Sequence, residues 1–417
     1  MKKVLKITAF IIIVLVIGIL GYSYISFNSY APADPEVQID KNVQHYFHNS
    51  YVESRKAFLA EAKKIEAKFD SVQIFSRKVP SRIDTNLTID FCYIPAQGKT
   101  DKLLIITSGT HGVEGYVGSA VQQMLMSEIL TPEKVDNVGI LLVHSVNPFG
   151  FKYIRRVTEN NVDFNRNCDI NKSLFLSKNE GYGKLIGMLN PTGKVNAGSI
   201  KNKFFMLVAI NQLLKKSMAS LRQAVLQGQY KYKNGLYFGG FSFEPQLAIL
   251  GNVFKTISTD YSTVFNIDLH TGYGARGVAH LFPNPIDDKK IKSGLETIFK
   301  GYEINWGDSD DFYIINGSFT DYIGKLLNDK TYFPMVLEYG TLNSQSTVGS
   351  IKSIHNMILE NQGFHYGYKS SSDSIKVMQS FIEMYNPSSE KWRTKIINDS
   401  KILFRKTLKN YADLKTN

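Results

Sequence analysis

The stretch that decides the fold is KLLIITSGTHGVEG, residues 102–115. Its first six residues form a short apolar run, which is typical of a strand buried on both faces of a sheet. Ser-Gly-Thr-His-Gly follows directly, and glycine permits the tight backbone bends of such a turn. A helical pattern over residues 118–130 then leads to a second apolar run, VGILLVH at residues 138–144. This strand–helix–strand order predicts a mostly parallel sheet.

Further helices and strands are predicted on either side of this stretch. Apolar residues recur at helical spacing over residues 45–69 and 204–227, whereas residues 230–243 are rich in Tyr, Gly and Phe and read as a loop or hairpin. Four more segments have strand patterns: SVQIFSRKVP (71–80), TIDFCYIPA (88–96), VFNIDL (264–269) and YFPMVLEYG (332–340). The sequence therefore predicts an α/β fold, a mostly parallel doubly wound sheet with helices on both faces.

Composition favours an ordinary globular protein with a basic surface. The 417 residues exceed one minimal domain, and 43% hydrophobic with 21% charged residues supplies a sizeable core. The net charge of +12 could suit nucleic acid, but the lysines are scattered and no nucleic-acid motif accompanies them. We expect no nucleic-acid partner. A solvated basic surface, or attraction to an anionic membrane or acidic cell-wall material, accounts for the charge.

The two cysteines, Cys92 and Cys168, do not form a CxxC pair. A disulfide scaffold and a cysteine-based zinc module are therefore not expected. Whether the two residues pair with each other stays open from the sequence.

The N-terminus has the pattern of a membrane anchor. Three lysines within the first six residues precede an uncharged, mostly apolar run over residues 7–27. About 20 helical residues span a hydrocarbon core about 30 Å thick, and the preceding lysines place the N-terminus in the cytoplasm. The rest of the chain would then lie outside the cytoplasm. The alternative is a cleaved signal peptide and a secreted or periplasmic product, although the run is long and the Ala-Pro-Ala at residues 31–33 is interrupted by proline.

Four segments follow from these patterns. We expect a membrane anchor or signal segment at residues 1–30 and a linker with a helix at residues 31–74. The catalytic domain would occupy residues 75–370, and residues 371–417 would form a charged, helical C-terminal extension.

A metal site is the most specific chemical prediction. His111 and Glu114 lie three residues apart in a tight turn after a strand, and His270 ends another strand. Imidazole nitrogens and carboxylate oxygens are ordinary zinc ligands, and a catalytic site uses about three of them plus an open position. Asp268 lies two residues before His270 on the same strand face, so it could orient that ring. Ends of neighbouring parallel strands are where ligand sites collect.

These motifs resemble the zinc carboxypeptidase superfamily of the carboxypeptidase A type. Its signature of His-x-x-Glu and a distant His matches His111, Glu114 and His270 in order. The chain also resembles the aspartoacylase and succinylglutamate desuccinylase branch, through GTHGVE (109–114), DFNR (163–166) and DLH (268–270). The likeness covers about residues 75–370. Within this superfamily, the chain most resembles an uncharacterised bacterial group. The likeness implies a bound Zn²⁺ ion.

The resemblance also implies roles for residues outside the metal cluster. Asn165 and Arg166 would bind the free carboxylate of the substrate, for which the planar guanidinium of Arg is suited. Arg156 would hold the developing oxyanion, with Arg155 as its alternative. Glu338, at the end of a strand, would be the general base that takes a proton from water and passes it to the leaving amine.

Tyr313 is a further substrate-binding candidate by resemblance. The family has a mobile Tyr shortly before a Gly-Ser-x-Asp-aromatic phrase, and Tyr313 precedes Asn316 to Tyr322. This chain departs from the pattern by an inserted Thr320. Tyr237, in the loop or hairpin above, could also line a substrate cleft.

The function expected from the sequence is zinc-dependent hydrolysis of an amide or peptide bond. A metallocarboxypeptidase that removes the C-terminal residue of a peptide or cell-wall peptide is favoured, because a translocated enzyme meets such substrates. One alternative is a deacylase of N-acyl amino acids. A second is a binding protein that uses this fold without catalysis. The exact substrate, the native metal and the oligomeric state stay open.

Overall fold

The computed structural model describes residues 1–98, 101–132, 137–213, 218–307 and 315–415. Within them lies one seven-stranded sheet of order β1-β2-β4-β3-β5-β7-β6. Its strands are β1 (Gln73–Lys78), β2 (Thr88–Ile94), β3 (Lys102–Ser108), β4 (Gly139–His144), β5 (Thr263–Gly272), β6 (Ala279–Phe282) and β7 (Thr331–Gly340).

The centre of the sheet is parallel and its margins are antiparallel. β3 pairs in parallel with β4 and β5, and β5 with β7. β2 and β6 run antiparallel to their neighbours, and β1 runs antiparallel to β2, so five of the seven strands share one direction. The predicted α/β fold with a mostly parallel sheet is confirmed. β6, which the sequence analysis did not predict, is a four-residue edge strand.

Helices cover both faces of the sheet because successive residues of β3 point to opposite sides. Leu104 and Ile106 belong to one buried cluster, and Leu103 and Ile105 to another. The first cluster is covered by α2 (Tyr51–Glu66), α3 (Gly115–Met124), α12 (Lys289–Ile298) and α16 (Glu390–Asp413). The second is covered by α11 (Pro245–Ile257) and α13 (Phe319–Leu326). This arrangement confirms the doubly wound prediction.

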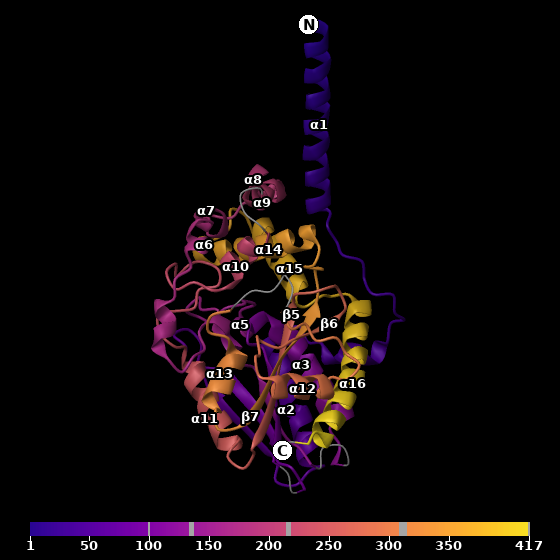
Figure 1. The fold of residues 1–417 in the computed structure, drawn as a ribbon, viewed down its shortest axis with the longest axis vertical. Coiled ribbons are helices and arrows are strands. Elements are labelled where there is room, and N and C mark those ends of the chain that lie inside the picture. Colours follow the sequence, from indigo (N-terminus) through magenta and orange to yellow (C-terminus); the bar gives the residue numbers. More distant parts are fainter. Residues whose placement is uncertain (99–100, 133–136, 214–217, 308–314, 416–417) are drawn as a thin grey trace.

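A third group of helices gathers at the end of the molecule from which α1 (Lys2–Asn28) projects (Figure 1). It comprises α6 (Glu180–Gly183), α7 (Ile186–Leu189), α8 (Ile200–Lys203), α9 (Phe205–Leu213), α10 (Met218–Leu226), α14 (Thr347–Tyr366) and α15 (Ser371–Tyr385), with α5 (Pro148–Lys152) beneath them. The helical pattern at residues 204–227 is thus confirmed outside residues 214–217, which are not among the described ones. Residues 230–243 form a loop, in which Phe238 makes an isolated β-bridge with Gln229.

The segments on either side of the predicted catalytic domain share its core. Phe58 of α2 and Trp392 and Phe404 of α16 are fully buried in the same cluster as Ile106. Cys92 and Cys168 are both buried and free, so they do not pair.

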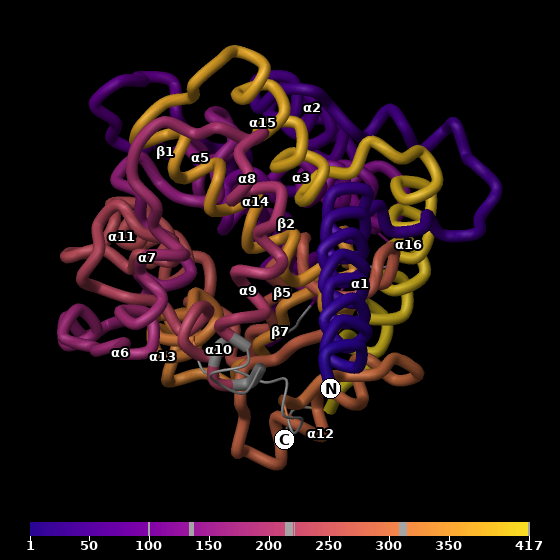
Figure 2. Tube along the Cα trace, turned by 90° about the horizontal axis from the view of Figure 1, so that it is seen from above, coloured from indigo at the N-terminus to yellow at the C-terminus, as the bar shows by residue number. Residues whose placement is uncertain are grey.

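Helix α1 is long and apolar enough to cross a membrane, and none of its most apolar window is buried. A signal sequence has the same properties. Only the last turns contact the rest of the chain, where Phe27 is buried against Phe205 and His355 at ring-centroid distances of 6.3 and 5.3 Å. Viewed along its axis, α1 lies beside α9 and α14 (Figure 2).

Candidate metal centre

The site lies where β3 and β5 end side by side. Their parallel pairing aligns Ser108 with Leu269, so the turn after β3 meets the last residues of β5. His111 lies in that turn, Glu114 ends the short 3₁₀-helix Gly112–Glu114, and His270 is on β5. The turn needs glycine, since a Cβ at Gly112 would lie 2.2 Å from the backbone of Gly150.

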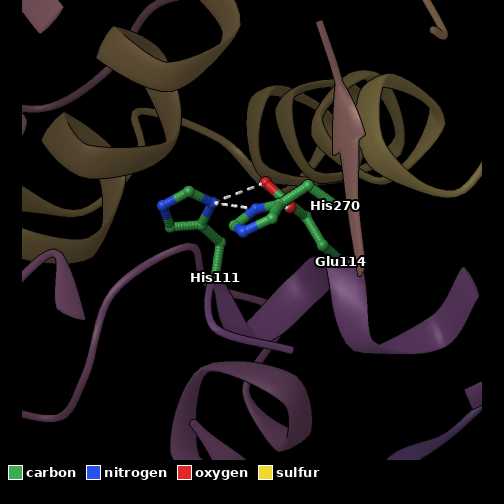
Figure 3. Close-up of side chains that lie close together, drawn as sticks. All are labelled: His111, Glu114 and His270. Atoms are coloured by element: carbon green, nitrogen blue, oxygen red, sulfur yellow. Dashed lines mark hydrogen bonds and ion pairs between the residues drawn. The ribbon is translucent and has the colours of Figure 1, made fainter. Parts of the chain in front are cut away.

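The three predicted ligands converge on one point. Nδ1 of His111 lies 2.9 Å from Oε1 of Glu114 and 3.2 Å from Nδ1 of His270. Nδ1 of His270 lies 2.9 Å from Oε2 of Glu114. All three side chains are buried, and Figure 3 shows them turned toward one another from separate elements. Sequence reasoning about strand ends therefore brought together the correct side chains.

Two carboxylates hold the far sides of the two rings. Asp268 Oδ2 lies 2.7 Å from Nε2 of His270, and Thr107 and Thr110 donate to Asp268 Oδ1 at 2.7 and 2.9 Å. Asp163 Oδ1 lies 3.3 Å from Nε2 of His111. A proton on each Nε2 would face a carboxylate and leave the Nδ1 lone pair toward the centre, the arrangement that metal-binding histidines adopt.

Charge is concentrated at this buried point. Burial by itself would raise the pKa of Glu114, but His111 and His270 outweigh burial and hold that pKa below its ordinary value. Burial opposes protonation of His270, yet Asp268 and Glu114 raise its pKa well above the ordinary value. Asp268 and Glu114 therefore favour positive charge at this point, whether it is a proton on His270 or a bound cation.

The donor set fits a tetrahedral divalent cation. Ligand atoms about 2.0–2.1 Å from a central zinc, at the corners of a tetrahedron, are separated by about 3.3–3.4 Å. The distances of 2.9–3.2 Å between donor atoms of His111, Glu114 and His270 are close to this spacing. Three protein ligands leave one position of a tetrahedron open. Among the described residues, this is the one group of three or more His, Cys, Asp or Glu with metal-ligand spacing.

Glu338 lies directly across from His270 on β7, as its register partner. Its Oε2 is buried and has no hydrogen-bond partner within the described part of the chain. Burial raises the pKa of Glu338 to about 8; Glu114 adds to this rise, whereas His270 and Arg156 oppose it. A carboxylate in this state is suited to exchanging protons near neutral pH.

Arg156 contacts the metal cluster, and its neighbour Arg155 does not. Nη2 of Arg156 lies 2.7 Å from Nε2 of His111, and its Nε donates to Asp163 Oδ2 at 3.0 Å. Arg155 is buried elsewhere, where its Nε donates to Glu360 Oε1 at 2.7 Å. Nε2 of His111 thus faces both the Arg156 guanidinium and the Asp163 carboxylate.

The other predicted substrate groups border the same space. Asn165 and Arg166 belong to the short helix Phe164–Arg166, and both line the cavity. Asn165 Oδ1 accepts from the backbone N–H of Phe319 at 2.8 Å, and Arg166 Nε donates to Leu226 O at 2.8 Å. These contacts fix both side chains in place. Tyr313 lies outside the described residues, so its place stays a prediction.

Sequence reasoning missed two contributors to the site. Tyr385 comes from α15, in the predicted C-terminal extension, and lines the cavity beside the metal cluster. Asp163 was part of a recognised motif, but its contact with His111 was not anticipated. Tyr237, named only as a possible cleft residue, has the Arg156 and Arg166 guanidinium carbons 5.3 and 5.5 Å from its ring centroid. No local sequence signal distinguishes Tyr385 from the other tyrosines.

A cavity of about 460 Å³ opens over the cluster. His111, His270 and Glu338 border one end, together with Arg156, Asn165 and Arg166. The remaining lining comes partly from the helices at the α1 end of the molecule, and partly from the end of β5, the segment after β6 and the start of α13. Its volume is within the range of small-molecule sites, about 300–1,000 Å³.

The chain belongs to the family described as protein of unknown function (DUF2817), whose model matches residues 47–399. That match spans the sheet, the three candidate ligands and the first part of α16. No curated protein sequence matches the chain.

Solved structures similar to the chain include carboxypeptidase A from Helicoverpa armigera, at 14% identity, covering 81% of this chain and 74% of the other, with a TM-score of 0.39. Bovine thrombin-activatable fibrinolysis inhibitor, in complex with tick carboxypeptidase inhibitor, is 13% identical to the chain. The match covers 82% of this chain and 98% of that chain, with a TM-score of 0.43. A metallo-carboxypeptidase from Burkholderia cenocepacia is 12% identical to the chain. The match covers 77% of this chain and 71% of that chain, with a TM-score of 0.40. With TM-scores this low, the chemistry has to be inferred from the site itself.

Proposed function

We propose that the chain is a membrane-anchored, zinc-dependent hydrolase of amide bonds, most specifically a carboxypeptidase that removes the C-terminal residue of a peptide. One observation supports this above all. Two imidazoles and a carboxylate converge on one buried point, with a further carboxylate behind each ring, and Glu338, whose Oε2 is buried without a hydrogen-bond partner in the described part of the chain, lies beside them. This combination provides both a place for a cation and a group to move protons.

His111, Glu114 and His270 would hold the zinc ion. Bound there, the ion would supply Lewis acidity and a lowered pKa for water. Asp268 and Asp163 would keep the two rings oriented through Nε2. Burial of all three ligands limits competing water at the site.

The chain's own groups would carry the remaining steps. Glu338 would accept a proton from the attacking water and deliver it to the leaving amine, for which a pKa near neutrality is suited. Arg156 would donate to the oxygen on which negative charge develops. Arg166 and Asn165 would bind the terminal carboxylate of the peptide and so place the last amide bond at the metal end.

The membrane assignment rests on α1. It is long, apolar and unburied except at its end, and three lysines precede the apolar run. We infer an uncleaved anchor with the catalytic part outside the cytoplasm. Cleavage at a signal site would instead leave a secreted or periplasmic enzyme.

Metal content and hydrolysis together test the proposal. We expect purified protein to bind one zinc per chain, and His111→Ala to lose it, whereas the matched control His45→Ala, at an exposed histidine, keeps it. Zinc-loaded protein should release the last residue of an N-blocked dipeptide, and amidation of its C-terminus should abolish release. Stoichiometric zinc in His111→Ala would contradict the assignment.

The deacylase alternative stays a prediction from the sequence. The same assay with an N-acyl amino acid distinguishes it from the carboxypeptidase. Hydrolysis of N-acyl amino acids with no action on the blocked dipeptide would favour that alternative. Stoichiometric zinc without hydrolysis of either substrate would favour the binding protein.

A further inference from the structure

Part of the cavity wall is apolar. Four helices contribute to it: α7, α9, α10 and α14. Its side chains include Met188, Ala209, Val225, Leu226, Ile354 and Met357. The same helices also contribute the polar side chains of Gln212, Arg222 and Ser353 to the lining. The cavity therefore combines the candidate reaction groups with a largely apolar helical wall.

The helices of this apolar wall also hold α1. Phe205, at the start of α9, and His355, on α14, pack against Phe27. Lys352 of α14 lies with its Nζ 4.7 Å from the ring centroid of Phe27. Asn28, the last residue of α1, donates to the backbone carbonyl of Lys203 at 2.8 Å. The apolar wall is thus attached directly to the segment that would leave the membrane.

The surface at this end has the character of a membrane interface. Ile200 on α8 is 80% exposed, and the exposed Lys201 follows it. Tyr24 of α1 and Phe204 pack in a tilted arrangement with their ring centroids 5.4 Å apart, just beside α8. Apolar and basic side chains together favour contact with anionic lipid. The surface beside the end of α1 is therefore suited to contact with a membrane.

We propose that the cavity binds the acyl chain of a lipid-linked peptide that the enzyme takes from the membrane holding α1. This inference rests on the proposed hydrolase function and names its substrate class. The acyl chain would lie along α7, α10 and α14, and the peptide's amide would reach Glu338. One water is consumed: the C–N bond breaks, a C–O bond forms, and the amine leaves with the proton that Glu338 delivers.

Burial of the acyl chain in the cavity should have a measurable effect on substrate binding. Each methylene transferred from water to an apolar wall contributes about 0.8 kcal/mol, which is about fourfold in binding. A purely polar peptide would leave Met188, Ile354 and Met357 uncovered by matching groups. We therefore expect a strong dependence of KM on acyl length.

The test uses the full chain in lipid nanodiscs, loaded with zinc. Two substrates share one dipeptide and differ only in the N-acyl group, acetyl or dodecanoyl. We expect kcat/KM for the dodecanoyl substrate to be at least about tenfold higher, chiefly through KM, from the burial of a few methylenes. Equal kcat/KM for the two substrates would overturn the inference while leaving the proposed function intact.

Variants separate the cavity from simple partition into the membrane. Ile354→Gln and Met188→Gln, on two different helices, should each lower the dodecanoyl-to-acetyl ratio at least about threefold, since each removes part of the apolar wall. Ile375→Gln, an exposed change on α15, should leave the ratio unchanged. Melting temperatures check that the variants fold. A ratio that stays high in both cavity variants would mean partition alone, and would overturn the inference.

Absence of hydrolysis for both substrates would count against the proposed function instead. Binding of a fluorescent fatty acid, dansylundecanoate, then tests the cavity without catalysis. Binding by the wild type that weakens in Ile354→Gln and not in Ile375→Gln would support the acyl site. No binding, or equal binding by all three proteins, would overturn it.

Discussion

Two pairs of strands each place a carboxylate directly across from a histidine, with opposite results. On β2 and β4, Asp90 faces His144; on β7 and β5, Glu338 faces His270. Asp90, His144 and His270 are buried, and Glu338 is half-buried. The first pair is closed by neighbouring side chains, and the second is left open toward a cavity.

In the closed pair, neighbouring side chains neutralise and hydrogen-bond the Asp90 carboxylate. Arg55 donates to both carboxylate oxygens of Asp90 at 2.7 and 2.9 Å, and Ser76 and Thr88 also donate to that carboxylate. His144 stacks on Phe58 at 4.7 Å between ring centroids, and burial lowers its pKa to about 4. This histidine is therefore neutral, and the pair serves the fold.

The open pair lacks such partners. Glu338 Oε2 has no donor within the described residues, and the His270 ring is flanked by two carboxylates, Asp268 and Glu114. Buried charge alone therefore does not mark a functional site. What marks it is that His111, Glu114 and His270 converge on one point beside Glu338 Oε2, which has no hydrogen-bond partner among the described residues.

The largest expected effect comes from neutralising Glu338. Glu338→Gln should lower kcat about 10³-fold, within the range that a lost general base produces, and leave one zinc per chain. Steady-state kinetics and metal analysis measure both. Asp90→Asn is the matched change in the closed pair, and it should lower stability without selectively lowering kcat. Near-normal kcat in Glu338→Gln would remove the residue from the reaction.

Opening the closed pair should cost stability instead of activity. Arg55→Ala leaves Asp90 buried without its cation, and loss of one partner of a buried ion pair costs about 3–5 kcal/mol. Because the Arg55 side chain is 32% exposed, we expect the lower end of that range. Denaturant unfolding measures the loss, and Arg77→Ala, an exposed arginine on β1, serves as the control. A loss below about 1 kcal/mol would mean that solvent already screens this pair.

Removing the carboxylate that contacts the candidate ligand His270 should have an intermediate effect, on zinc affinity. Asp268→Asn removes the charge that orients His270, and such outer contacts are worth about 10–100-fold in metal affinity. Competition with a zinc chelator measures the affinity. Unchanged affinity in this variant would indicate that His270 is positioned by the strand alone.

The smallest expected effect is a pH dependence of stability from His144. Since its folded pKa is lowered to about 4 from an ordinary 6.5, only the unfolded chain takes up a proton between these values. Stability should therefore fall as pH drops from 6.5 to 4, by about 2 kcal/mol at pH 5. His144→Gln should flatten that part of the pH profile of unfolding. An unaltered slope would contradict the assignment of a neutral, buried ring.

Sequence reasoning brought the three candidate ligands together because their placement depends on strand ends. His111 and His270 each follow or end an apolar run, and parallel strands bring such ends to one edge. Glu338 is accessible to the same reasoning. The catalytic and substrate roles of these residues stay predictions until they are measured.

Other parts could not be derived in this way. β6 has only four residues, too few for a clear alternation, and the short helices α6–α8 carry little periodic signal. Asp163 and Tyr385 reach the site through long-range packing, so nothing in the neighbouring sequence predicts their contacts. The apolar wall also depends on how four separate helices assemble.

Diffraction from crystals soaked in zinc, recorded at the zinc absorption edge, tests the central claim most directly. The account predicts one strong anomalous peak about 2.0–2.2 Å from His111 Nδ1, His270 Nδ1 and a carboxylate oxygen of Glu114, with a fourth position open to the cavity. A peak elsewhere, or either imidazole turned away from it, would contradict the account.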